Sequence, residues 1–93
     1  METREAIEAR VSGRVQGVGF RWHTRETARA AGLRGWVRNE ADGTVTLRAE
    51  GSPDGLRSLR EFLARGPRGA RVDGLDIESV PPRGEDEGFE VRS

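Results

Sequence analysis

The sequence GRVQGVGFR, Gly13–Arg21, contains three glycines and two arginines around a short apolar motif. A strand-like segment, Ala6–Ser12, precedes it, and a helix-like segment, Trp22–Ala31, follows it. Glycine loses more conformational entropy on ordering than any other residue, and a buried arginine needs a partner for its charge. Such a composition between a strand and a helix therefore indicates a turn with a specific role.

The remaining segments follow the periodicities of strands and helices. Ile7, Ala9 and Val11 alternate with polar residues, which is typical of a half-buried strand. Ser52 and Pro53 are a favoured N-cap and a favoured first residue for a second helix. The other expected boundaries are strands at Leu33–Arg38, Thr44–Glu50, Arg71–Val80 and Phe89–Arg92, with the second helix ending at Gly66.

This order, β-α-β-β-α-β followed by a short strand, predicts the fold class. Asp42 and Gly43 form a turn pair that indicates a hairpin between the second and third strands. Two helices of this length cannot cover both faces of a five-stranded sheet, so both should pack on one face. We expect an α+β, ferredoxin-like βαββαβ sandwich with a mixed or antiparallel sheet, a short extra C-terminal strand and one partly open face. Residues 1–93 are expected to form a single domain.

Composition excludes several classes of protein. The 93 residues carry 16 basic and 16 acidic side chains, whereas a dedicated nucleic-acid binder has a basic excess. The absence of cysteine excludes disulfides, thiolate metal sites and a cysteine nucleophile. No apolar run approaches the roughly 20 residues that cross a bilayer, and METREAIEAR lacks the order of a signal peptide. We expect a cytoplasmic protein without metal or cofactor, and with neither nucleic acid nor membrane as partner.

The glycine-rich turn has the composition of an anion-binding site. Backbone N–H groups at the start of a helix converge on one spot, where the helix dipole adds partial positive charge. Glycine at positions 13, 17 and 19 allows the chain to curl, and the guanidinium of Arg21 can bind two phosphoryl oxygens. The Gly-Lys-Ser/Thr ending of a Walker A loop is absent. On this pattern alone a purely structural turn stays open.

Two longer motifs resemble a known family. VSGRVQGVGFR, Val11–Arg21, is similar to the first signature of the acylphosphatases, and GWVRNEADGTVTLRAEG, Gly35–Gly51, is similar to their second. The resemblance implies metal-independent hydrolysis of the carboxyl-phosphate bond of a small acyl phosphate, with inorganic phosphate as product and inhibitor. It implies that Arg21 binds the phosphoryl group and that Asn39 orients the attacking water. The implied substrate-binding loop consists of Val15, Gln16, Gly17, Val18, Gly19 and Phe20.

The chemistry of an amide suits the role implied for Asn39. Its side chain can accept a hydrogen bond from water and stays neutral beside an anionic substrate, where a carboxylate would repel the phosphate. An amide has no pKa near neutrality, so another group must accept the proton of the water. An oxygen of the substrate's own phosphate is the simplest hypothesis. Without the resemblance, Asn39 could equally be an ordinary turn residue.

Other residues of these motifs have simpler interpretations. We expect Gln16 to brace the loop, and Arg14 either to attract an anionic substrate or to be a solvated surface residue. His23 is expected on the surface, directed away from the turn. Trp22 and Trp36 are interpreted as packing residues rather than substrate platforms.

Two rival functions stay open on the sequence. An RNA-binding module uses the same element order but stacks bases on strand aromatics, and the third strand here, TVTLRAE, contains none. An anion-sensing domain would bind phosphate without turnover. A monomer is the expected state for so small a domain.

Overall fold

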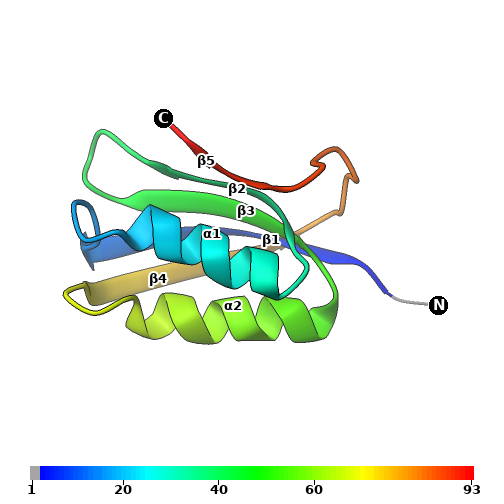
Figure 1. Ribbon diagram of the computed structural model, residues 1–93, viewed down its shortest axis with the longest axis horizontal. Helices are drawn as coiled ribbons and strands as arrows, with labels where there is room; N and C mark the ends of the chain where they lie inside the picture. The colour runs from blue at the N-terminus through cyan, green and yellow to red at the C-terminus, as the bar shows by residue number, and fades with distance from the viewer. Residues whose placement is uncertain (1–2) are drawn as a thin grey trace.

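The structure, a computed structural model, describes residues 3–93 and contains two helices and one five-stranded sheet (Figure 1). Both helices lie on one face of the sheet, which confirms the predicted α+β, ferredoxin-like arrangement. No helix in this part of the chain is long and apolar enough to cross a membrane. The elements are β1 (Glu5–Arg14), α1 (Phe20–Ala30), β2 (Arg34–Asn39), β3 (Val45–Gly51), α2 (Pro53–Arg65), β4 (Arg71–Val80) and β5 (Phe89–Arg92).

The order of the strands brings three chain segments to one end of the molecule. The sheet runs β4-β1-β3-β2-β5, with antiparallel pairs except for the parallel pair of β2 and β5. β1, β2 and β5 therefore point the same way. Their carboxyl ends meet at the left end in Figure 1, where the β1–α1 loop and the β2–β3 hairpin also lie.

A β-bulge bends β1 shortly before this end. The register between β1 and β4 shifts between Ser12 and Gly13, since Ser12 faces Gly74 whereas Gly13 faces Val72. A Cβ on Gly13 would lie 2.2 Å from the carbonyl oxygen of Arg71, so only glycine fits without movement of β4. Bulges bend a strand and change the direction of the chain that follows, which here is the β1–α1 loop.

The core fixes the start of α1. Ile7, Leu47 and Leu59 are fully buried between the helices and the sheet, and burial of such a side chain contributes about 1.5–3 kcal/mol. Phe20, the first residue of α1, is also buried, and its ring lies 5.8 Å from that of Phe62 in α2. Burial of the Phe20 side chain therefore fixes the backbone at the beginning of α1.

The face of the sheet opposite the helices is partly covered by the chain itself. β4 and β5 lie at opposite edges, so residues 81–88 cross this face. Glu50 is buried beneath them and accepts hydrogen bonds from the N–H groups of Arg83 (2.7 Å) and Gly84 (3.0 Å). Arg48, also buried, donates to the carbonyl of Pro81 at 2.9 Å.

Glu50 is ionised in this setting. Burial alone would raise the pKa of its carboxyl, but the two N–H donors and the charges of Arg4 and Arg48 outweigh it and lower the pKa below the usual 4.5. The carboxylate therefore acts as a fixed anion that holds the crossing segment against β3.

Candidate active site

The β1–α1 loop leaves its backbone amides without acceptors. Gly17 and Gly19 have φ of 75° and 76°, in the left-handed region that favours glycine, as expected for the curled turn. Gly19 is the N-cap of α1 but supplies no side-chain hydrogen bond, and the first turn contains no acidic residue. The hydrogen bonds of residues 3–93 include none donated by the backbone N–H groups of residues 16–20. These amides and the helix dipole make the loop a positively polarised cradle.

A pocket of about 290 Å³ opens beside this cradle. It brings together six of the eight predicted site residues, namely Val15, Gly17, Gly19, Phe20, Arg21 and Asn39. The other two, Gln16 and Val18, contribute backbone to the loop, while their side chains point elsewhere. Val18 packs against the hydrophobic core. Three further lining residues, Trp22, Arg25 and Val91, were not predicted.

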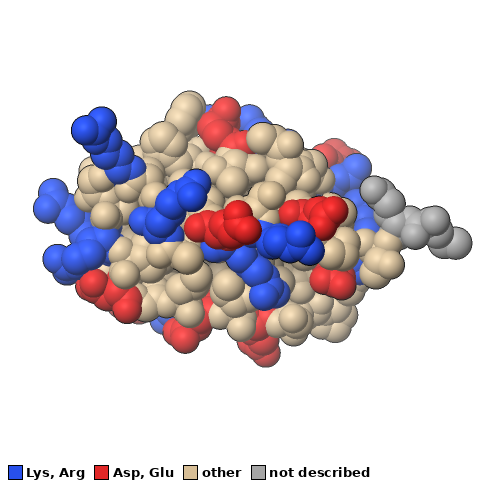
Figure 2. All heavy atoms as spheres, turned by 90° about the horizontal axis from the view of Figure 1, so that it is seen from below, with Lys and Arg blue, Asp and Glu red and all other residues tan. Residues whose placement is uncertain are grey.

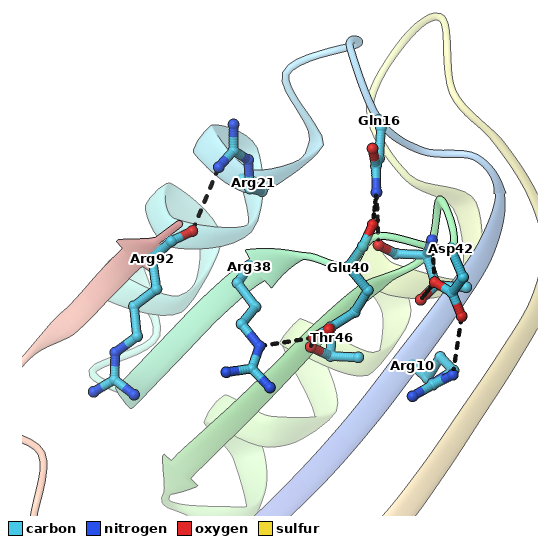
Figure 3. Close-up of polar contacts among 9 residues, drawn as sticks. Arg10, Gln16, Arg21, Arg38, Glu40, Asp42, Thr46 and Arg92 are labelled. Carbon is cyan, nitrogen blue, oxygen red and sulfur yellow. Dashed lines mark hydrogen bonds and ion pairs between the residues drawn. The ribbon is translucent and has the colours of Figure 1, made fainter.

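Arg21 carries a charge that no nearby acid neutralises. It lies in the first turn of α1, where its Nη1 donates to the carbonyl oxygen of Arg92 in β5 at 3.4 Å (Figure 3). None of the ion pairs among residues 3–93 involves Arg21. β5 thus steadies one edge of the guanidinium and leaves its other N–H groups available to an anion.

Asn39 lines the same pocket and carries an unpartnered acceptor. It is the last residue of β2, one position beyond the predicted end of that strand, and its side-chain Oδ1 is buried without a hydrogen-bond partner among the described residues. A buried acceptor without a donor costs about 1–3 kcal/mol. Such a cost is typical of a group whose partner is a ligand or a bound water.

Gln16 fastens the cradle to the hairpin that bears Asn39. Its Nε2 donates to the carbonyl oxygens of Glu40 (2.8 Å) and Thr44 (2.9 Å), at the two ends of the β2–β3 turn (Figure 3). This is the bracing role that the sequence suggested. The two halves of the site, from chain segments more than 20 residues apart, are therefore held in fixed relation.

The acidic residues of the hairpin are directed away from the pocket. The side chain of Glu40 accepts hydrogen bonds from the hydroxyl of Thr46 and the guanidinium of Arg38. Both bonds lower the pKa of its carboxyl, the one from Thr46 more strongly. The pKa of Asp42 is lowered by the hydroxyl and the N–H of Thr44. Both carboxylates are ionised at neutral pH, and neither lines the pocket.

The surface around this end of the molecule is basic although the net charge is zero. Figure 2 shows basic side chains gathered at the left end, where the β1–α1 loop lies. Arg14 lies at the end of β1, and Arg65 and Arg68 lie where α2 leads to β4, whereas Arg71 at the start of β4 is paired with Asp73 at 3.0 Å. A local positive field of this kind raises the encounter rate with anions.

The structure corrects the interpretation of Trp22. Its side chain is 52% exposed at the edge of the pocket instead of packed in the core. The buried residues of α1 are Phe20, Thr24 and Ala28, on one stripe with a spacing of four residues. Because the sequence placed the helix start at Trp22 instead of Phe20, the first and largest residue of this stripe was missed. A stripe begun at Phe20 would have placed Trp22 outside it.

Trp36 and His23 do not line the pocket. Trp36 is half-buried, and its ring lies beside the guanidinium groups of Arg38 (4.9 Å) and Arg92 (5.3 Å). His23 is exposed, and its ring meets that of Trp22 edge-on at 4.9 Å. Among residues 3–93 no three His, Cys, Asp or Glu side chains are close enough to hold a metal ion.

Comparisons with known proteins show what this chain is similar to. The family model for acylphosphatase matches residues 7–91. The acylphosphatase of Salinibacter ruber is 51% identical over 90 residues, which are 97% of this chain and 95% of that protein. Two solved acylphosphatases superpose closely. The Bacillus subtilis structure has a TM-score of 0.91 at 31% identity, covering 96% of this chain and 99% of that one. The Coxiella burnetii structure has a TM-score of 0.90 at 38% identity, covering 96% and 93%. The chain therefore belongs to the acylphosphatase family.

Proposed function

We propose that this protein hydrolyses acyl phosphates to a carboxylate and inorganic phosphate without a metal or a cofactor. The names of its relatives support the reaction class. The observation that carries the proposal is local: Arg21, whose charge is unpaired, the uncapped start of α1 and Asn39, whose buried Oδ1 has no partner among the described residues, line one pocket.

The cradle and Arg21 bind the phosphoryl group. Its peripheral oxygens accept hydrogen bonds from the loop amides, and the guanidinium binds two of them with its remaining N–H groups. These donors are fixed before the substrate arrives, because Phe20 is buried, Gln16 ties the loop to the hairpin and Arg92 holds Arg21. Fixed donors stabilise the charge on the phosphoryl oxygens as the bond breaks.

Asn39 holds the nucleophile. Its Oδ1 accepts a hydrogen bond from a water molecule, whose oxygen forms a bond to phosphorus while the bond from phosphorus to the acyl oxygen breaks. The carboxylate leaves with the bonding electrons and needs no protonation. The residues that line the pocket in the described chain include no carboxylate and no imidazole. The proton of the water therefore passes to a phosphate oxygen, and the product phosphate competes with substrate for the cradle.

The same features bear on the working state of the protein. All the residues that the proposed mechanism uses belong to one chain, so a monomer suffices as the catalytic unit. The absence of cysteine is compatible with the cytoplasm as its location.

Hydrolysis of benzoyl phosphate in the presence of a chelator tests the proposal. We expect full activity of the wild type, and a loss of about 10²–10³ in kcat for Arg21→Lys, which keeps the charge but loses the fork. The matched control is Arg29→Lys. Arg29 also lies on α1 and donates to a β5 carbonyl, that of Phe89 at 3.1 Å, but it lies outside the pocket. Near-full activity of Arg21→Lys would remove the two-pronged contact from the mechanism.

Asn39→Ala separates binding from chemistry. We expect turnover to disappear, whereas the dissociation constant of inorganic phosphate, measured by calorimetry, changes by less than about threefold. A severe loss of phosphate affinity would contradict the water-holding role. If the wild type binds phosphate but hydrolyses no acyl phosphate, the chain is an anion-binding domain and not an enzyme.

A further inference from the structure

Two exposed apolar side chains lie at the mouth of the phosphate pocket. Trp22 is 52% exposed and Val91 is 37% exposed, and they are the two exposed large hydrophobic residues among positions 3–93. Single exposed apolar residues are ordinary on protein surfaces. Here both line the pocket that contains Arg21 and Asn39, so their exposure is confined to one site.

The fold explains why both side chains are exposed at this place. Val91 follows buried Phe89 by two residues in β5, so both belong to the face of the sheet that carries the helices. Phe89 lies in the core and Val91 lies closer to the carboxyl end of β5, at the pocket. Trp22 directly follows Arg21 on α1, and the ring of His23 supports the indole edge-on at 87°.

The position of the phosphoryl group determines what meets these side chains. An acyl phosphate has its phosphoryl group at one end, and the proposed function places that group between the loop amides and Arg21. The remainder of the molecule then occupies the part of the pocket bounded by Trp22 and Val91. An apolar acyl group that covers them removes apolar surface from water, and an aromatic one also stacks on the indole.

Arg25, which lines the same pocket, could instead attract an acyl group with a second negative charge. Its Nε lies 3.1 Å from the carboxylate of the adjacent Glu26, so a second negative charge on the acyl group would compete with this partner. The apolar side chains carry no such competing partner. The balance of these contacts favours an uncharged acyl group.

We propose that the enzyme selects acyl phosphates with apolar, preferably aromatic, acyl groups, and that Trp22 and Val91 form the surface that contacts the acyl group. This inference rests on the proposed function, because it needs the phosphoryl group in the cradle. In this proposal Trp22 contributes to substrate affinity, whereas the cradle and Asn39 carry out the chemical step.

Steady-state kinetics with benzoyl phosphate and acetyl phosphate tests this assignment. For Trp22→Ala we expect KM for benzoyl phosphate to rise about tenfold, while kcat, KM for acetyl phosphate and inhibition by phosphate stay within about twofold. Trp22→Phe should restore most of the affinity for benzoyl phosphate. Trp36→Ala is the matched control, since it removes the other tryptophan from the opposite face and should change neither KM.

Three outcomes would overturn the inference. One is an unchanged KM for benzoyl phosphate in Trp22→Ala, and another is an equal rise for both substrates. The third is a wild-type dimer in sedimentation that Trp22→Ala dissociates, because the indole would then be covered by a second copy of the chain.

Binding measurements distinguish failure of this inference from failure of the proposed function. If the wild type hydrolyses neither substrate, the proposed function is wrong. Calorimetry with phenylphosphonate and methylphosphonate then still tests the apolar surface, since Trp22→Ala should weaken only the phenyl compound. Equal weakening of both would reject the surface independently of catalysis.

Discussion

The two helices begin in opposite ways. α2 begins after Ser52, whose hydroxyl accepts a hydrogen bond from the N–H of Gly55 at 3.1 Å, and its first turn contains Pro53 and Asp54. Such residues provide hydrogen-bond acceptors for the free N–H groups of the first turn and a negative charge that complements the helix dipole. α1 begins after Gly19, with no side-chain cap and no acid, and Arg21 adds positive charge where the dipole is already positive.

Both helices pack on the same face of the same sheet, but their starts lie at opposite ends of the molecule (Figure 1). At the start of α2, the side chain of Ser52 accepts a hydrogen bond from a backbone N–H group, and this contact stabilises the helix. The start of α1 is left unsatisfied and positively charged, and it lies at the phosphate pocket. A departure from local stabilising rules therefore coincides with the end of the molecule that contains the proposed site.

The largest effect should come from giving α1 an acid in its first turn, as α2 has. Arg21→Glu should lower kcat/KM for benzoyl phosphate by at least about 10³, because a donor is lost and a repelling charge is gained. The free energy of unfolding should fall by no more than about 1 kcal/mol, since the new charge suits the helix dipole. Activity assays and urea denaturation measure the two. A parallel collapse of stability would show that Arg21 is structural.

A smaller effect should follow from a change in the N-cap of α1. Gly19→Ala places a side chain at φ of 76°, which costs about 1–2 kcal/mol, although the added Cβ meets only the ring of His23 at 3.5 Å. We expect the midpoint of urea denaturation to fall accordingly and phosphate to bind more weakly, because relief of the strain moves the loop amides. Unchanged phosphate affinity in calorimetry would mean that the position of Gly19 does not shape the cradle.

The smallest effect should come from the cap of α2. Ser52→Ala removes one side-chain hydrogen bond and should cost about 1 kcal/mol in the free energy of unfolding. Both KM and kcat should equal those of the wild type, because this helix start lies outside the pocket. Chemical denaturation and benzoyl phosphate kinetics provide the two readings. A change in kinetics would show that the two helix starts are coupled.

The sequence predicted the elements because their signals are local. The alternation in β1, the Asp42–Gly43 turn and the Ser52 cap each lie within a few residues, and every predicted boundary lies within two residues of the observed one. The start of α1 shows where such signals fail. A glycine N-cap in the left-handed region has no capping side chain that the sequence could reveal. The predicted helix therefore began two residues late.

What the sequence did not predict depends on contacts between distant segments. Glu50 and Arg48 alternate with core residues of β3 and would be read as solvent-facing, yet the crossing segment buries them. The bond from Arg83 to Glu50 spans 33 positions, and the position of Val91 beside α1 depends on the parallel pairing of β5 with β2. Arg21 and Asn39 were identified through the family motifs, whereas the pocket edge formed by Trp22 and Val91 appears only in three dimensions.

The bulge at Gly13 links the proposed phosphate cradle to β4, a strand that lies outside the pocket. β4 lines no part of the phosphate pocket, but its main chain at Arg71 and Asp73 occupies the space that any side chain on residue 13 would need. The direction in which the chain leaves β1 is consequently decided at the outer border of the sheet. Partial detachment of β4 would misalign the amides of the β1–α1 loop before the core unfolds. Phosphate affinity should therefore fall when β4 opens locally, under milder conditions than those that unfold the whole protein.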